Sequence, residues 1–135
     1  MGTDTPQAKV LVVDDEHAIA DTFVEIFRCA NYDAKAAYSA ETALEEAKAW
    51  HPDVAIVDVI LPNMNGLGLA AALEIYVPKC QVLMFSGQEA TPPLLAAART
   101  VEMNHVMFEK PIHPKALLDE LAFLLSGKRN NSSAA

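Results

Sequence analysis

Short apolar segments alternate along the chain with longer segments whose apolar residues recur at helical spacing. Five of the short segments have the continuous or alternating apolar pattern typical of strands, and they cover residues 10–13, 33–37, 54–57, 82–85 and 105–108. The second is the most polar, because it contains Asp33 and Lys35. The first, third and fourth are apolar throughout, which is typical of strands that are buried on both faces.

Each expected strand is followed by a segment with a helical pattern. The expected helices are one around residues 19–27, one from Ser39 to about Trp50, one from Gly66 to about Tyr76, one opened by Thr91 and Pro92, and one from Pro114 with an apolar stripe of Leu117, Leu121, Leu124 and Leu125. Ser39 is a favoured capping residue, and proline is favoured at the first position of a helix.

Five repeats of strand and helix predict an α/β fold with a doubly wound parallel sheet. Parallel neighbours need a crossover connection, and a helix usually supplies it. The three continuous apolar strands belong in the middle of the sheet, with the second and fifth at its edges. The expected strand order is therefore 2-1-3-4-5, with helices on both faces.

The composition fits one folded domain. The chain has 135 residues, of which 52% are hydrophobic and 21% charged, and this length is enough for a single core. We expect a flexible N-terminus over residues 1–8, a domain over 9–126 and a frayed tail over 127–135. Cys29 and Cys80 are too few and too far apart for a metal knuckle, so we interpret both as small core residues.

Charge and hydropathy exclude several kinds of partner. No apolar run approaches the roughly 20 residues that span a bilayer, and the N-terminus lacks an apolar signal region, so we expect a cytoplasmic protein with no membrane partner. The net charge is −8, and the basic residues are scattered except for the pair Lys128 and Arg129. No basic stripe is available to follow a phosphate backbone, so we expect no direct binding of nucleic acid.

Polar residues stand at the carboxyl ends of the expected strands, where open α/β sheets bind ligands. In chain order these residues are Asp14 and Asp15 after the first strand, Asp58 at the end of the third, Ser86 after the fourth, and Glu109 and Lys110 after the fifth. Each of them alone has an ordinary structural explanation as a helix cap, a turn former or a solvated charge. Together, after four strands of one sheet, they indicate a functional site.

The three aspartates predict a metal ion. Carboxylates that converge in one crevice repel each other, and a divalent cation relieves this repulsion. Oxygen ligands without His or Cys favour Mg²⁺ over Zn²⁺.

Four motifs, "VLVVDDE", "VDVILPNMNG", "MFSG" and "FEKP", follow one another in this order. Together they resemble the receiver domain of response regulators in bacterial two-component systems, and the resemblance covers residues 9–126. It implies a flavodoxin-like three-layer sandwich. It also implies that Asp58 is the phosphoacceptor and a metal ligand, that Asp15 binds Mg²⁺ directly, that Asp14 does so largely through water, and that the Ile60 carbonyl is a further ligand.

The resemblance implies two further site residues and a set of partners. Ser86 would hydrogen-bond a phosphoryl oxygen, and Lys110 would pair with the phosphoryl group. The donor would be a sensor histidine kinase or a phosphotransfer protein, and the receiver of the signal a downstream protein target or a fused output domain. The chain would be a monomer or a phosphorylation-dependent homodimer. It would catalyse only its own phosphorylation and dephosphorylation, and so would not be an enzyme.

One residue departs from the family pattern, and two other interpretations of the site remain open. Met107 stands where the family usually carries an aromatic residue that takes part in switching. A Mg²⁺-dependent phosphohydrolase with an aspartate nucleophile is the alternative function, but it needs a second Asp two residues after the nucleophile, where this chain has Ile60. A receiver-like fold kept only for docking would make the acidic residues dispensable. The chain is either a stand-alone receiver or part of a longer protein.

Overall fold

The computed structural model describes residues 7–59, 61, 66–86, 106–109 and 113–134. Within these residues the strands are β1 (Lys9–Val13), β2 (Asp33–Ala37), β3 (Val54–Asp58), β4 (Gln81–Ser86) and β5 (Val106–Glu109). They form one parallel sheet in the order β2-β1-β3-β4-β5. The predicted α/β class and parallel sheet are confirmed, and the order agrees with the prediction.

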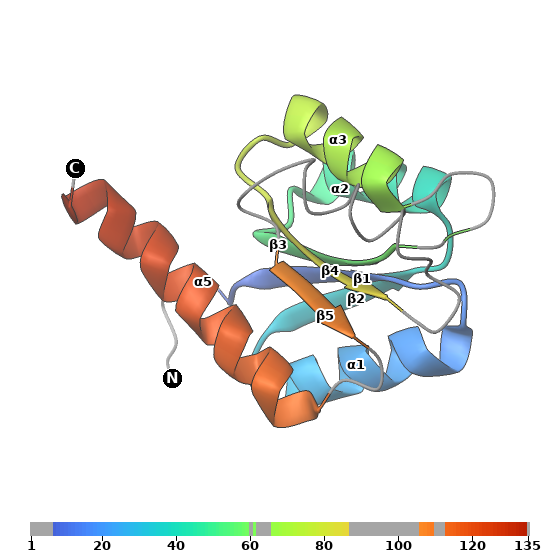
Figure 1. Cartoon of the computed structure of the whole chain (residues 1–135), viewed down its shortest axis with the longest axis horizontal. Coiled ribbons are helices and arrows are strands. Elements are labelled where there is room, and N and C mark those ends of the chain that lie inside the picture. Colours follow the sequence, from blue (N-terminus) through green and yellow to red (C-terminus); the bar gives the residue numbers. More distant parts are fainter. Residues whose placement is uncertain (1–6, 60, 62–65, 87–105, 110–112, 135) are drawn as a thin grey trace.

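Helices cover both faces of this sheet. Figure 1 shows α2 (Ala40–Trp50) and α3 (Gly66–Tyr76) on one face, and α1 (His17–Cys29) and α5 (Pro114–Ala134) on the other. The helix expected to open at Thr91 lies outside the described residues. α5 continues to Ala134, whereas the sequence predicted that the domain ends at residue 126; the flexibility of the terminal segments stays a prediction.

Alternating side chains divide the core into two layers. Val10 and Val12 of β1 point into the layer under α1 and α5, whereas Leu11 and Val13 point into the layer under α2 and α3. The alternation follows from the two-residue period of a strand. Every residue of β3 is buried, as a continuous apolar strand in the middle of a parallel sheet requires.

The two cysteines differ in burial. Cys80 is buried, as the sequence predicted, but Cys29 is exposed, so the prediction of a core position was wrong for Cys29. Cys29 is the last residue of α1, whose buried face is formed by Ala20, Phe23, Val24 and Phe27. Residues on a helix share a face at a spacing of three or four, and Cys29 lies off that face.

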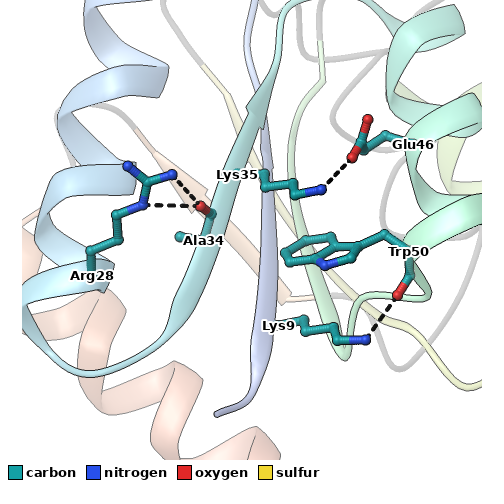
Figure 2. Close-up of polar contacts among 6 residues, drawn as sticks. All are labelled: Lys9, Arg28, Ala34, Lys35, Glu46 and Trp50. Carbon is teal, nitrogen blue, oxygen red and sulfur yellow. Dashed lines mark hydrogen bonds and ion pairs between the residues drawn. The ribbon is translucent and has the colours of Figure 1, made fainter. Parts of the chain in front are cut away.

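Side chains from both neighbouring helices hold the edge strand β2. The guanidinium of Arg28 in α1 donates two hydrogen bonds to the Ala34 carbonyl, at 3.2 and 3.0 Å. On the other side, Lys35 forms an ion pair with Glu46 at 2.8 Å, and its Nζ lies 4.7 Å from the ring centroid of Trp50. Figure 2 shows these contacts on the two sides of the strand. They tie β2 to α1 and α2.

Candidate metal and phosphoryl site

The carboxyl ends of the central strands bring the three predicted aspartates together. β1 and β3 are paired up to Val13 and Val57, so Asp14 and Asp58 follow at the same level of the sheet. Carboxylate oxygens of Asp14, Asp15 and Asp58, one from each residue, lie within 4.8 Å of one another. The acidic cluster therefore consists of residues that are far apart in the sequence and adjacent in the fold.

Strand alternation explains why Asp14 and Asp58 face the same way. Val12 and Ile56 lie in the core layer under α1 and α5, and each of the two aspartates comes two residues later. Both carboxylates are therefore directed toward the α1 side of the sheet edge. Asp14 is fully buried and Asp58 is 5% exposed, while Asp15 is exposed.

Hydrogen bonds fix the Asp14 backbone and one of its carboxylate oxygens. The Asp14 N–H donates to the Ala37 carbonyl at 3.1 Å, and Asp14 Oδ1 accepts from the Glu16 N–H at 3.0 Å. The second bond is the turn-forming role expected of an aspartate just before a helix. Asp14 thus serves the local turn and also contributes to the acidic cluster.

Gly66 allows α3 to begin directly beside Asp58. The Gly66 N–H donates to the Val59 carbonyl at 2.6 Å, and a Cβ on Gly66 would lie 2.9 Å from Val59 Cα and also meet the Asp58 carbonyl. No side chain fits at that separation, so only glycine allows this approach. The sequence predicted a helix that begins at Gly66, and the structure gives the physical reason for a glycine at that position.

The chemistry of the cluster suits a hard divalent cation. Its ligand atoms are carboxylate oxygens, which Mg²⁺ prefers. The side of the cluster at Asp15 is exposed, and Mg²⁺ retains several water molecules in most protein sites. Carboxylates at this separation repel each other unless a cation or a proton reduces their charge. The residues present therefore fit Mg²⁺.

The other predicted site residues are only partly covered by the structure. Ser86 is the last residue of β4, next to Phe85, which pairs with Asp58 across the sheet. Ser86 itself pairs with Glu109, the last residue of β5. The backbone thus brings the ends of β3, β4 and β5 to one edge. Lys110 and Ile60 lie outside the described residues, so their predicted roles stay predictions.

One contact group beside the cluster was not predicted from the sequence. Tyr38, directly after β2, stacks on His17 and hydrogen-bonds Asp21. No periodicity or motif marks these three residues. The only signal is an aromatic residue after an edge strand, which is too common to indicate a site.

The fold and the site together define a class of protein, an open parallel α/β protein with a carboxylate cluster of the metal-binding type at the carboxyl edge of its sheet. The sequence profile of the response regulator receiver domain matches residues 10–122. The chain therefore belongs to the response regulator receiver domain family, as the four motifs indicated.

Known relatives and structures agree with this assignment. The chain is 27% identical to the DNA-binding response regulator MtrA of Mycolicibacterium smegmatis over 134 residues, which are 98% of this chain and 56% of the relative. A CheY-like receiver domain of Methanospirillum hungatei has a TM-score of 0.83 at 24% identity, covering 93% of this chain and 98% of that one, and it supports the fold alone. A Burkholderia pseudomallei response regulator, solved with a phosphorylated aspartic acid, calcium ion and citrate, has a TM-score of 0.73 at 25% identity and covers 83% of this chain and 65% of that one.

The relatives correct one expectation about partners. The chain spans about half the length of the MtrA relatives, which are named as DNA-binding response regulators. The expectation of no nucleic-acid partner was therefore wrong, because the net charge describes only the residues of this chain and the relatives are longer. In the part of the chain that the structure describes, no helix is both long and apolar enough to cross a membrane.

Proposed function

We propose that this chain is a phosphoacceptor receiver, which takes a phosphoryl group onto Asp58 with the help of Mg²⁺. The observation that carries the proposal is the approach of Asp14, Asp15 and Asp58 to within 4.8 Å at the carboxyl edge of a receiver-type sheet. The phosphorylated aspartic acid and bound calcium in the Burkholderia relative support the same chemistry here. Membership of the family supports a signalling role in the cytoplasm.

The phosphoryl donor is a phosphohistidine of a sensor histidine kinase or of a phosphotransfer protein. A carboxylate oxygen of Asp58 forms a bond to phosphorus while the bond between phosphorus and the imidazole nitrogen breaks. The imidazole leaves with that electron pair and takes up a proton from water. Such a transfer needs alignment of the two groups and stabilisation of the phosphoryl oxygens more than covalent chemistry by the protein.

Asp14, Asp15 and Asp58 would hold Mg²⁺, Asp14 largely through water, and the resemblance to the family implies the Ile60 carbonyl as a further ligand. The ion would supply positive charge to the phosphoryl oxygens. Asp58 is nearly buried at the end of a central strand whose residues are all buried, and this packing restricts the positions open to its attacking oxygen. Lys110 pairs with the phosphoryl group and Ser86 donates a hydrogen bond to one of its oxygens.

The chain acts as an acceptor and not as an enzyme that turns over many substrates. It catalyses its own phosphorylation and the later hydrolysis of its own acyl phosphate. A phosphohydrolase would need a proton-transferring residue two positions after Asp58, and Ile60 cannot transfer a proton.

The relatives bear on the output of the switch. The DNA-binding relatives suggest that phosphorylation of this domain regulates a DNA-binding region in a longer protein. A protein target that docks on the phosphorylated domain is the second candidate output.

Phosphoryl uptake from a small acyl phosphate, followed by intact mass spectrometry, tests the proposal. The wild type should gain the mass of one phosphoryl group with Mg²⁺ and none when the metal is chelated. Asp58→Ala should gain none under either condition. Asp33→Ala, which removes an exposed carboxylate from the start of β2, is the matched control and should behave as the wild type.

Two results would contradict the proposal. Uptake by folded Asp58→Ala at the level of the wild type would show that another residue is the acceptor. Continuous release of phosphate far beyond one equivalent of protein on the timescale of uptake, without accumulation of phosphorylated protein, would favour the phosphohydrolase instead.

A further inference from the structure

A group of three side chains connects α1 to the segment that follows β2. The rings of Tyr38 and His17 are stacked, with centroids 3.7 Å apart and an interplanar angle of 20°. The Tyr38 hydroxyl donates a hydrogen bond to Asp21 Oδ1 at 2.6 Å. His17 and Asp21 are four residues apart on α1, so they lie on one face of the helix. A single tyrosine therefore contacts the first two turns of α1, and we call these three residues the Tyr38 clasp.

The end of β2, next to Tyr38, holds the other end of the loop between β1 and α1, at Asp14. The carbonyl of Ala37, the residue before Tyr38, accepts the 3.1 Å hydrogen bond from the Asp14 N–H. The segment from Asp14 to His17 is thus attached at its first residue to Ala37 and at its last residue to Tyr38. Asp15 lies between these two attachment points.

The position of the Asp15 carboxylate depends on the backbone of its turn, which the bond from the Glu16 N–H to Asp14 Oδ1 also holds. The Asp15 side chain is exposed, so core packing does not orient it. Glu16, at the N-cap position of α1, does not cap the helix with its side chain, and the first turn of α1 contains no acidic residue. Capping by Ser, Thr, Asp or Asn usually fixes the start of a helix. The stacking of Tyr38 on His17 adds a contact from outside the helix at this end of α1.

We propose that Tyr38 is a positioning residue for the magnesium site, acting through the backbone of Asp15. The clasp holds the start of α1 in place, so that the Asp15 carboxylate stays within reach of Asp14 and Asp58 before the ion binds. A loop that is ordered before the ion binds loses little conformational entropy on binding, and this favours a higher affinity. The inference rests on the proposed function, because it assumes that the acidic cluster binds Mg²⁺.

A purely structural role for Tyr38 makes a different prediction. It would lower the stability of the domain and leave the affinity of the folded protein for Mg²⁺ unchanged. Tyr38→Phe keeps the stacked ring and removes only the hydrogen bond to Asp21, whereas Tyr38→Ala removes both contacts. Tyr76→Ala is a matched control, because it removes a tyrosine that is 55% exposed on α3 and, within the described residues, makes no contact with the Tyr38 clasp. The Tyr76 ring centroid lies 4.4 Å from Lys48 Nζ.

Isothermal titration calorimetry with MgCl₂, on variants of this chain shown to be folded by circular dichroism, tests the proposal. We expect Tyr38→Ala to weaken Mg²⁺ binding by about tenfold, in the range found when residues that support metal ligands are removed. Tyr38→Phe should weaken it by less, because the stacked ring is kept. Tyr76→Ala should leave the dissociation constant unchanged.

The possible failures are distinguishable. If folded Tyr38→Ala binds Mg²⁺ as tightly as the wild type, the clasp proposal is wrong and the proposed function stands. If the wild type itself binds no Mg²⁺, the proposed function fails and the clasp proposal fails with it. If Tyr38→Ala does not fold, His17→Ala and Asp21→Ala each remove one contact of the clasp. Weaker binding by both supports the proposal, and unchanged binding by either overturns it.

Discussion

Gly66 shows how a single residue links the fold to the site. It is the first residue of α3, and its backbone lies against the backbone of Asp58 and Val59. The hydrogen bond from Gly66 N–H to the Val59 carbonyl, at 2.6 Å, keeps α3 close to the end of β3. Any larger residue would push the helix away from the strand that carries the expected phosphoacceptor.

Replacement of Gly66 by alanine should destabilise the domain by about 1–3 kcal/mol, the usual cost of forcing an extra carbon into a packed site. The free energy of unfolding, measured by urea denaturation, gives this value. Gly68→Ala is the matched control, because Gly68 is exposed in the same helix. Alanine there should be neutral or should stabilise by roughly 0.5–1 kcal/mol. Equal effects at both positions would contradict the close-approach explanation.

The Tyr38 phenol should titrate at an unusually high pH. The pKa of Tyr38 is raised above its ordinary value of 10.0, mainly by the hydrogen bond that the hydroxyl donates to Asp21. Partial desolvation of the hydroxyl and the negative charge of Asp21 raise it further. A raised pKa in the folded state means that the folded protein holds this proton more tightly than the unfolded chain. The stabilising contribution is therefore complete below pH 10.0 and is lost as the pH rises through the folded-state pKa.

Ultraviolet absorbance of the phenolate measures this pKa. The chain has three tyrosines, so subtraction of the Tyr38→Phe titration from that of the wild type isolates Tyr38. In Asp21→Asn the midpoint assigned to Tyr38 should move down, because the carboxylate is lost. An unchanged midpoint in that variant would show that Asp21 does not control the titration.

At the scale of elements, the edge strand β2 depends on contacts with its two helices. Lys35 and Lys9 both approach the ring of Trp50, with Nζ atoms 4.7 and 5.9 Å from its centroid, and Lys9 Nζ also donates to the Trp50 carbonyl at 3.1 Å. Figure 2 shows the Trp50 side chain between the two lysines. The half-buried indole also packs against the core layer under α2 and α3. Trp50 therefore connects the end of α2 to β1 and β2.

We expect Trp50→Ala to lower the free energy of unfolding by about 2 kcal/mol, since it removes buried area and two cation–π contacts. Glu46→Gln should lower it by less than about 1 kcal/mol, because the Lys35–Glu46 pair is substantially exposed. The side chains of that pair are 43% and 35% exposed. Urea denaturation of both variants gives the comparison. A larger effect of Glu46→Gln than of Trp50→Ala would contradict this ranking.

Most of the described elements could be predicted from local patterns. Ser39 accepts a hydrogen bond from the Thr42 N–H and caps α2, as its position in the sequence indicated. The strand positions also follow from the apolar segments, since burial on both faces leaves a continuous signal. The end of α5 was less predictable, because the polar residues after 126 carry no apolar periodicity.

At the scale of the whole molecule, the sequence identifies the site because parallel topology brings distant strand ends to one edge. Asp14, Asp15 and Asp58 could be placed together without coordinates for this reason. The contacts of Tyr38 could not be predicted, because they depend on the path of the chain after an edge strand. The expectation about nucleic acid failed for another reason, since the charge of one domain does not describe a longer protein.

The most direct test of the central claim is to locate the phosphoryl group. Wild-type protein is exposed to a small acyl phosphate and Mg²⁺, reduced with borohydride and digested. Reduction converts an aspartyl phosphate into homoserine, which tandem mass spectrometry then assigns to one position. We predict homoserine at residue 58 alone, and none when Mg²⁺ is chelated during the phosphorylation. Homoserine at another aspartate, or none at any position in Mg²⁺, would contradict the assignment of Asp58 as the phosphoacceptor.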